Sequence, residues 1–332
     1  MSPVRCTSDL DPRQNQAVDD HQLDHSGRGW PAKLRVPRTD GGEPLPARDT
    51  TESILAQLTD YVKAAGQMAL EEQRAMGGAP MRSPEVDRLS LRSYKEDNSV
   101  ITEADRRVED FLVDRIASLH PEANIITEET RLPFDPEKSP TFAIDPIDGT
   151  DVFSQGMPGW CVSVGLLDHD LTPVAGVVFA PRLDLLIVGH SAGAATLNGA
   201  QMPSPAPAEP ISPRSNLMVT SRIHKQLDLS GYVGKIRGIG SAALHLCYSL
   251  IYPPVIGALE GPGIHIWDIA AAHAINRAQG QDLSYLDSSS IDYAPMTDGG
   301  PGADVVMAGQ APVLQALREV LRRLPTDPRS AE

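Results

Sequence analysis

The stretch that decides the fold is Ala143-Ile144-Asp145-Pro146-Ile147-Asp148-Gly149-Thr150, which closes an apolar run. Its two aspartates stand three positions apart and are followed at once by Gly and Thr. Residues 142–144 predict a strand, Pro146 predicts its end, and Gly149 predicts a tight turn. Both carboxylates would then lie where the strand ends, and crowded oxygen ligands suit a hard cation such as Mg²⁺ beside a phosphate. Taken alone, the octapeptide also fits an ordinary Asp-Pro turn followed by a Gly turn.

The composition is that of an acidic globular protein. The chain has 332 residues, of which 41% are hydrophobic, enough for two modest domains or one large layered domain. The net charge of −15 argues against binding to the nucleic-acid backbone or to anionic membranes. We therefore expect no nucleic-acid partner and no membrane partner, and a phosphorylated ligand would need a cation to bridge it to the protein.

The cysteines and the N-terminal residues indicate a cytoplasmic protein. Cys6, Cys161 and Cys247 show no metal-binding spacing and cannot all pair with one another, so reduced thiols are the simplest account. The apolar surroundings of Cys161 and Cys247 predict that both are buried. No apolar stretch is long enough for a membrane span, and the N-terminal residues are charged and broken by prolines where a signal peptide needs an apolar core.

The first two parts of the chain differ sharply in pattern. Residues 1–48 are polar and have no period, which predicts a disordered extension. Residues 49–210 form a predicted α+β lobe. Apolar residues at helical spacing run from Thr51 to Gly77-Gly78, and a second helix starts at Thr102 with Asp105 in its first turn. The strands that apolar runs predict are 124–126, 142–144, 161–167, 174–179 and 185–188.

The third part, residues 211–332, follows five prolines between Gln201 and Pro213 that mark a lobe boundary. Its predicted strands are 217–219, 255–259 and 305–308, and its predicted helices are 241–250, 268–278 and 312–324. This alternation is typical of an α/β layer. The sequence therefore predicts a second, smaller α/β lobe.

Four separated segments carry a resemblance to a known family. They are Lys95 to Asp105 (KEDNSVITEAD), Glu128-Glu129, Asp145 to Thr150 with Phe153, and Gly263 to Ala271 (GIHIWDIAA) preceded by Gly240-Ser241-Ala242. In this order and at these separations they closely resemble the inositol monophosphatase family of Mg²⁺-dependent, lithium-sensitive phosphatases. The resemblance runs from about Thr51 to Leu324. It implies an α/β fold built as a layered αβαβα sandwich of the sugar-phosphatase type, commonly in a homodimer.

The resemblance also implies a set of metal ligands. Glu128, Asp145 and the main-chain carbonyl of Ile147 would hold a first metal, and Asp145 would bridge to a second metal that Asp148 and Asp268 also bind. Two or three Mg²⁺ ions are expected, and two divalent ions can clamp a phosphoryl group between the nucleophile and the leaving oxygen. The local alternatives are a solvated charge pair for Glu128-Glu129 and a helix N-cap for Asp268.

Catalytic and substrate-binding roles follow from the same resemblance. Thr150, hydrogen-bonded to Asp105, would orient and deprotonate the attacking water, although Asp105 also fits a simple helix-capping role. Lys95 would help to place Glu128 or an anion. Glu260 would accept from substrate hydroxyls, but it stands one residue further from the Trp-Asp pair than is usual in the family. Backbone amides at two helix starts would hold the substrate, and they belong to Gly149, Thr150, Gly240, Ser241 and Ala242.

Two rival interpretations come from other classes. A haloacid-dehalogenase-like phosphatase also has an apolar strand followed by Asp, Gly and Thr. Its two aspartates are two positions apart and face one side of the strand, whereas Asp145 and Asp148 are three apart. A catalytically silent regulator that binds metal or sugar phosphate is the other rival, and the complete set of expected carboxylates argues against it.

The substrate is the open point within the family. Relatives act on inositol monophosphates, 3′-phosphoadenosine 5′-phosphate, fructose 1,6-bisphosphate or histidinol phosphate. Asp151-Val152 matches neither the Thr-Asn of inositol phosphatases nor the Lys-Glu of bisphosphate nucleotidases, and Asp151 would repel a second phosphate. Residues 176–181 (GVVFAP) instead resemble the nucleotidase branch. We expect a small phosphorylated polyol as substrate, and prefer inositol monophosphate.

Overall fold

A computed structural model describes residues 47–324, apart from residues 77–92, 95–99 and 192. The chain divides into two units, Met1–Leu45 and Pro46–Glu332, and all described residues belong to the second. The predicted disordered extension lies outside the described residues, except that residues 47 and 48 are helical. The predicted helix end at Gly77-Gly78 and the motif residues Lys95 to Ser99 also lie outside them. No helix in the described part of the chain is long and apolar enough to cross a membrane.

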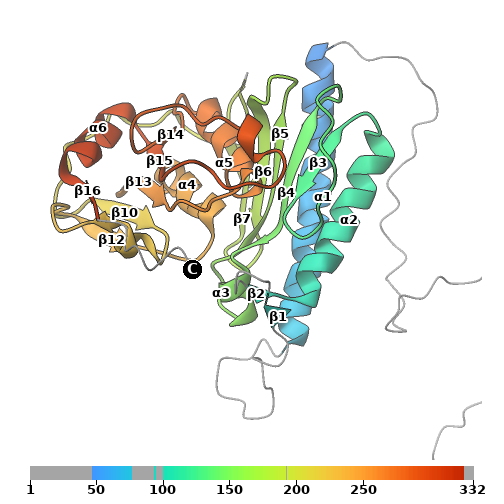
Figure 1. Ribbon diagram of the computed structural model, residues 1–332, viewed down its shortest axis with the longest axis horizontal. Helices are drawn as coiled ribbons and strands as arrows, with labels where there is room; N and C mark the ends of the chain where they lie inside the picture. Colours follow the sequence, from blue (N-terminus) through green and yellow to red (C-terminus); the bar gives the residue numbers. More distant parts are fainter. Residues whose placement is uncertain (1–46, 77–92, 95–99, 192, 325–332) are drawn as a thin grey trace, which may run out of the picture. The chain divides into compact units, whose positions relative to one another are not determined.

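Helices α1 (Ala47–Ala75) and α2 (Glu103–Leu119) cover one face of a seven-stranded sheet (Figure 1). Their apolar residues recur every three or four positions, so one side of each helix is buried against the sheet. A short ribbon of β1 (Ser93–Tyr94) and β2 (Val100–Ile101) precedes α2. The strands of the sheet are, in spatial order, β3 (Asn124–Thr127), β4 (Thr141–Asp148), β5 (Cys161–Leu167), β6 (Pro173–Ala180), β7 (Leu185–His190), β8 (Thr196–Leu197) and β9 (Ala200–Gln201).

The opposite face of this sheet carries α5 (Ile266–Ala278), with α4 (Ala242–Ile251) beside it (Figure 1). Side chains alternate along β4, so Phe142 joins the core under α1 and α2 while Ala143 joins the core under α5. The helix approaches the sheet closely, because a Cβ added to Gly165 would lie 2.6 Å from the Cβ of Ala270. This close packing fixes the position of α5 against the sheet.

A five-stranded sheet lies on the other side of α4, and α6 (Ala311–Val320) covers its far face (Figure 1). Its strands are, in spatial order, β12 (Lys235–Arg237), β10 (Asn216–Val219), β13 (Val255–Glu260), β15 (Val306–Gly309) and β14 (Ser284–Tyr285). The remaining short elements are η2 (Ile223–Lys225), β11 (Leu227–Asp228), η3 (Ala294–Met296) and β16 (Arg322–Arg323). The layers alternate between helices and sheets, and the predicted αβαβα sandwich is confirmed.

Strand β4 runs further than the sequence predicts. It continues through Pro146 to Asp148, and its pairing with β5 shifts register between Asp145, opposite Ser163, and Asp148, opposite Cys161. Pro146 and Ile147 therefore form a bulge, which accommodates a proline that has no N–H for the ladder. The predicted strand end at Pro146 is wrong, and both aspartates are held by a bulged strand rather than by a turn.

Two further features concern the second half of the chain. Helix α6 ends at Val320 rather than near Leu324, because Arg322–Arg323 pair with β11 as β16. The lobe boundary near residue 210 stays a prediction, and the largest hydrophobic core draws on both halves, since it contains Ala143 as well as Met218 and α5. The residues that meet between the two sheets therefore come from both halves of the chain.

Candidate active site

Three carboxylates meet where β4 ends and α5 begins. Asp145 and Asp148 come from the bulged end of β4, and Asp268 is the third residue of α5. One carboxylate oxygen from each lies within 4.8 Å of the other two, so a single cation can contact all three. An all-oxygen donor set of this kind suits a hard divalent cation such as Mg²⁺.

Asp145 is the most confined member of this cluster. It is 1% exposed, and its Oδ1 accepts no hydrogen bond from any described residue. Burial raises the pKa of Asp145 well above its usual range, and the negative charges of Glu128, Asp148 and Asp268 raise it further. A buried carboxylate oxygen without a donor, surrounded by other acids, is stabilised by a cation. The residues present therefore fit a divalent metal.

Asp148 is held by the first turn of α4. Its Oδ2 accepts from Ser241 Oγ at 2.6 Å and from the Ala243 amide at 2.7 Å, and its Oδ1 accepts from the Ala242 amide at 3.0 Å. Burial and the charge of Asp268 raise the pKa of Asp148 to about 7, although these hydrogen bonds act to lower it. The helix start that was predicted to bind substrate thus already orients a carboxylate of the chain itself, and a substrate role for Ser241 and Ala242 stays a prediction.

The turn before α4 requires glycine. Gly240 has φ +116°, and a Cβ at this position would lie 2.5 Å from Val152 Cγ1. Val152 belongs to α3 (Thr150–Ser154), so Gly240 lets the start of α4 lie directly against the start of α3. Gly149, the N-cap of α3, has φ +95°. The two helix starts that are predicted to bind substrate, at Gly149 and at Gly240, are therefore neighbours in space.

Asp105 and Thr150 form the predicted pair. Thr150 Oγ1 lies 2.9 Å from Asp105 Oδ1 and 3.0 Å from the carbonyl oxygen of Ile147, so its hydroxyl can donate to either. Asp105 Oδ2 accepts from the amide and the hydroxyl of Thr102, at 2.8 and 2.5 Å. One oxygen of Asp105 therefore caps α2 and the other contacts Thr150, whereas activation of water by this pair stays a prediction.

Asp268 reaches back to the start of its own helix. Its Oδ2 accepts from the His265 amide at 2.6 Å, and His265 is the N-cap of α5, so the alternative of Asp268 as N-cap is wrong. The His265 ring stacks on Trp267 with 4.7 Å between ring centroids, a contact that the sequence did not indicate. Glu128 is half-buried in the segment after β3, and its charge acts on Asp145.

Glu260 ends β13 and is buried beside a histidine. Its Oε1 lies 2.6 Å from His245 Nδ1, and His245 Nε2 accepts from the Ile239 amide at 2.9 Å. Burial raises the pKa of Glu260 above its usual range against the lowering effect of His245, and the charge of Asp268 raises it further. Glu260 is thus within electrostatic reach of the carboxylate cluster. Sequence reasoning missed His245, because a single histidine in an apolar helix gives no signal.

Two other supporting contacts also lack a sequence signal. Gln73 of α1 donates from Nε2 to the carbonyl oxygens of Phe153 and Met157, at 2.9 and 3.1 Å, and so fixes α3 behind Thr150. Cys161 is buried, as predicted, and its Sγ lies 3.3 Å from Ser241 Oγ. Both contacts join residues about eighty positions apart, which no local pattern can reveal.

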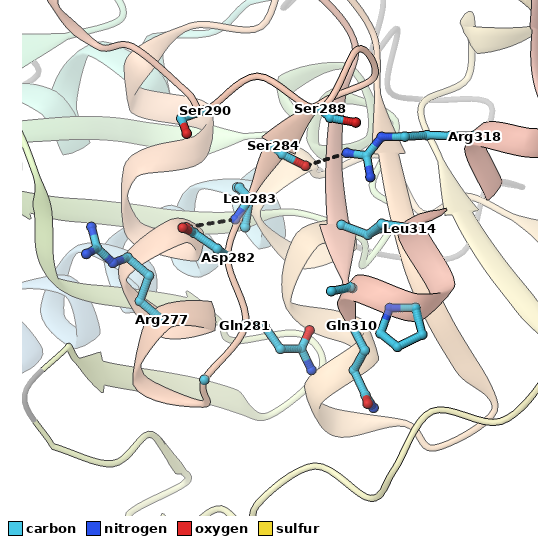
Figure 2. A pocket seen from close by; sticks show the side chains of 14 residues that line it. Arg277, Gln281, Asp282, Leu283, Ser284, Ser288, Ser290, Gln310, Leu314 and Arg318 are labelled. Atoms are coloured by element: carbon cyan, nitrogen blue, oxygen red, sulfur yellow. Dashed lines mark hydrogen bonds between the residues drawn. The ribbon is translucent and has the colours of Figure 1, made fainter. Parts of the chain in front are cut away.

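A separate pocket of about 570 Å³ lies at the opposite end of α5, and none of the predicted site residues lines it (Figure 2). Arg318 projects over it and donates to Ser284 Oγ at 2.7 Å. Its other labelled lining residues are Arg277, Gln281, Asp282, Leu283, Ser288, Ser290, Gln310 and Leu314. The convergence of buried acids, rather than this hollow, marks the candidate active site.

The sequence profile of the inositol monophosphatase family matches residues 52–319. The chain belongs to the inositol monophosphatase family. Inositol monophosphatase 1 of Solanum lycopersicum is 31% identical to it over 211 residues, which are 60% of this chain and 77% of that protein. The 3′(2′),5′-bisphosphate nucleotidase CysQ of Buchnera aphidicola is 28% identical over 74% of this chain and 91% of its own.

Solved structures show the same fold. The inositol monophosphatase from Anabaena has a TM-score of 0.62 and 22% identity, over 85% of this chain and 100% of that one. This inositol monophosphatase family member thus has the fold of a metal-dependent phosphatase family and an acidic cluster that can bind metal. The roles of its individual residues stay predictions, and the structure brings most of them together.

The raised pKa of Asp148 predicts how the stability of this family member depends on pH when divalent metal is removed with EDTA. Below about pH 4 the group is protonated in both the folded and the unfolded chain. As the pH rises towards 7, the unfolded chain releases this proton while the folded chain retains it, so the free energy of unfolding falls by a few kcal/mol and then levels off. Thermal unfolding in EDTA between pH 5 and pH 8 measures this.

Added Mg²⁺ is the matched condition. A cation binds the ionised carboxylates, so the increase in melting temperature on adding Mg²⁺ should be larger at pH 8 than at pH 6. A melting temperature in EDTA that does not change with pH would contradict the raised pKa of Asp148.

Proposed function

We propose that the protein is a Mg²⁺-dependent phosphomonoesterase that hydrolyses a small phosphorylated polyol, with inositol monophosphate as the preferred substrate. The observation that carries this proposal is the hydroxyl of Thr150, 2.9 Å from the buried carboxylate of Asp105 and two residues after Asp148 of the acidic cluster. A hydroxyl and carboxylate pair at the edge of a metal site can orient an attacking water and take up its proton.

The metal-holding residues of the proposal come from three places in the fold, namely the segment after β3, the end of β4 and the first turn of α5. A bound divalent cation supplies positive charge to phosphoryl oxygens and acidifies water. Asp148 is oriented by the start of α4 before any ligand arrives, whereas the buried Oδ1 of Asp145 has no donor among the described residues and is left for a cation. The complete proposed ligand set is Glu128, Asp145, the carbonyl oxygen of Ile147, Asp148 and Asp268.

Thr150 and Asp105 orient the attacking water in this proposal. When the Thr150 hydroxyl donates to Asp105, the lone pairs of Oγ1 are left to accept a hydrogen bond from water, and as Oγ1 takes the water proton its own proton passes to the Asp105 carboxylate. Asp105 stays fixed during this step, because Thr102 binds its other oxygen twice. The amides of Gly149 and Thr150 lie at the start of α3 and would hold phosphate oxygens.

Preference for a single phosphate rests on Asp151. This residue is exposed in the first turn of α3, directly after Thr150, where a second phosphate of the substrate would meet a like charge. The nucleotidase alternative is supported by the relative named CysQ and by residues 176–181. Most of that stretch lies in β6, where residues 176–180 are buried and a Cβ at Gly176 would lie 2.3 Å from the Ala271 carbonyl oxygen of α5, so these residues bear on the substrate less directly than Asp151 does.

A substrate panel tests the proposal. Phosphate release is measured with myo-inositol 1-phosphate, 3′-phosphoadenosine 5′-phosphate, fructose 1,6-bisphosphate and histidinol phosphate, each with Mg²⁺ and with EDTA. We expect the highest kcat/KM for the inositol phosphate and no turnover in EDTA. If another member of the panel has a higher kcat/KM, that compound becomes the proposed substrate. If no member is hydrolysed, the result supports a catalytically silent regulator instead. Inhibition by lithium, the homodimer and the cytoplasmic location stay predictions.

A further inference from the structure

His245 joins two parts of the site that lie far apart in the chain. It is buried in the first half of α4, and its ring contacts Glu260 at the end of β13 on one side and the amide of Ile239 on the other. Ile239 immediately precedes Gly240 and Ser241, whose hydroxyl holds Asp148. A chain of contacts therefore runs from Glu260 through His245 and the turn at residues 239–241 to Asp148 of the acidic cluster.

The hydrogen-bond partners assign the proton on the ring. A backbone amide can only donate, so His245 Nε2, 2.9 Å from the Ile239 amide nitrogen, is the acceptor. The proton of the neutral imidazole then lies on Nδ1, which donates to Glu260 Oε1 at 2.6 Å. His245 thus fixes both the turn before α4 and the orientation of the Glu260 carboxylate.

The two oxygens of Glu260 are not equivalent. Oε1 is taken by His245, whereas Oε2 accepts no hydrogen bond from any described residue and is not among the fully buried atoms. The residue as a whole is only 4% exposed, and its charge interacts with that of Asp268. One carboxylate oxygen therefore remains available beside the acidic cluster, in a position where few water molecules can reach it.

We propose that His245 is a positioning residue that sets substrate specificity, by turning Glu260 so that Oε2 faces a hydroxyl group on the alcohol part of the substrate. The inference rests on the proposed phosphatase function. A substrate with a hydroxyl opposite Oε2 donates a hydrogen bond to it. A substrate without that hydroxyl leaves a desolvated carboxylate oxygen unpaired, and the site therefore binds it more weakly. His245 itself touches neither the substrate nor the metal ligands.

Two substitutions separate the two hydrogen bonds of the His245 ring. His245→Asn retains an N–H donor near the place of Nδ1 and removes the acceptor at Nε2, whereas His245→Gln retains an amide near the place of Nε2 and removes the donor to Glu260. Both variants are assayed with Mg²⁺ on myo-inositol 1-phosphate and on phenyl phosphate, whose alcohol part has no further hydroxyl. Glu260→Gln is the third variant, because it changes the partner of His245 without altering α4.

We expect His245→Gln to raise KM for inositol phosphate about tenfold and to leave kcat unchanged, with KM and kcat for phenyl phosphate unaffected. His245→Asn should remain close to the wild type, and Glu260→Gln should resemble His245→Gln. Equal changes for both substrates would show a merely structural role and overturn the inference, as would an unchanged KM in His245→Gln and Glu260→Gln. Wild-type protein that hydrolyses neither substrate would remove the proposed function and this inference together.

Discussion

Asp145→Asn is expected to lower Mg²⁺-dependent phosphate release by about 10²- to 10³-fold and, in EDTA, to raise the melting temperature of the protein. The substitution keeps the size of the side chain and removes one negative charge from a buried group of acids. Because the carboxylate of Asp145 is desolvated and repelled by Glu128, Asp148 and Asp268, neutralising it stabilises the metal-free fold. Turnover and thermal unfolding, each with and without Mg²⁺, measure the two effects.

Asp148→Asn is the matched control. It removes a charge from the same cluster, but Asp148 accepts hydrogen bonds at both oxygens, from Ser241, Ala242 and Ala243. An amide nitrogen there would face another donor, so this variant should lose stability as well as activity. Turnover at the wild-type rate in either variant would remove the metal-site assignment. A loss of stability in Asp145→Asn would show that Asp145 is stabilised by the protein rather than by a cation.

Thr150→Val is expected to lower kcat by about 10²- to 10⁴-fold, whereas Thr150→Ser should remain within about an order of magnitude of the wild type. Valine has the shape of threonine and suits this nearly buried position, but it lacks the hydroxyl that lies 2.9 Å from Asp105. Serine retains the hydroxyl. Steady-state kinetics at saturating Mg²⁺ measure the difference.

The stabilisation of both Thr150 variants by Mg²⁺ serves as the control. The side chain of Thr150 is not among the proposed metal ligands, so the increase in melting temperature on adding Mg²⁺ should match that of the wild type. A wild-type kcat in Thr150→Val would exclude the hydroxyl from proton transfer and would leave water activation to other groups.

Local patterns predicted much of the fold. Helix α2, strand β5 and helix α5 follow from apolar period and capping signals, and their bounds differ from the predicted ones by at most two residues. Pro146 misled the prediction, because a proline that ends a strand and a proline at a bulge look the same in sequence. The short strands β12 and β14 gave no signal, since two or three residues cannot establish a period of two.

The sequence by itself determined which residue types are present and in what order, and hence the family and the candidate ligands Glu128, Asp145, Asp148 and Asp268. Only the tertiary structure decided what each carboxylate faces. Oδ1 of Asp145 has no donor in the described part of the chain, Asp148 is held by the start of α4, and Glu260 is bound by His245. The physical reason is that a hydrogen bond or a pKa depends on the distance between groups, and packing brings Asp148 and Ala243, 95 positions apart in the chain, to within 2.7 Å.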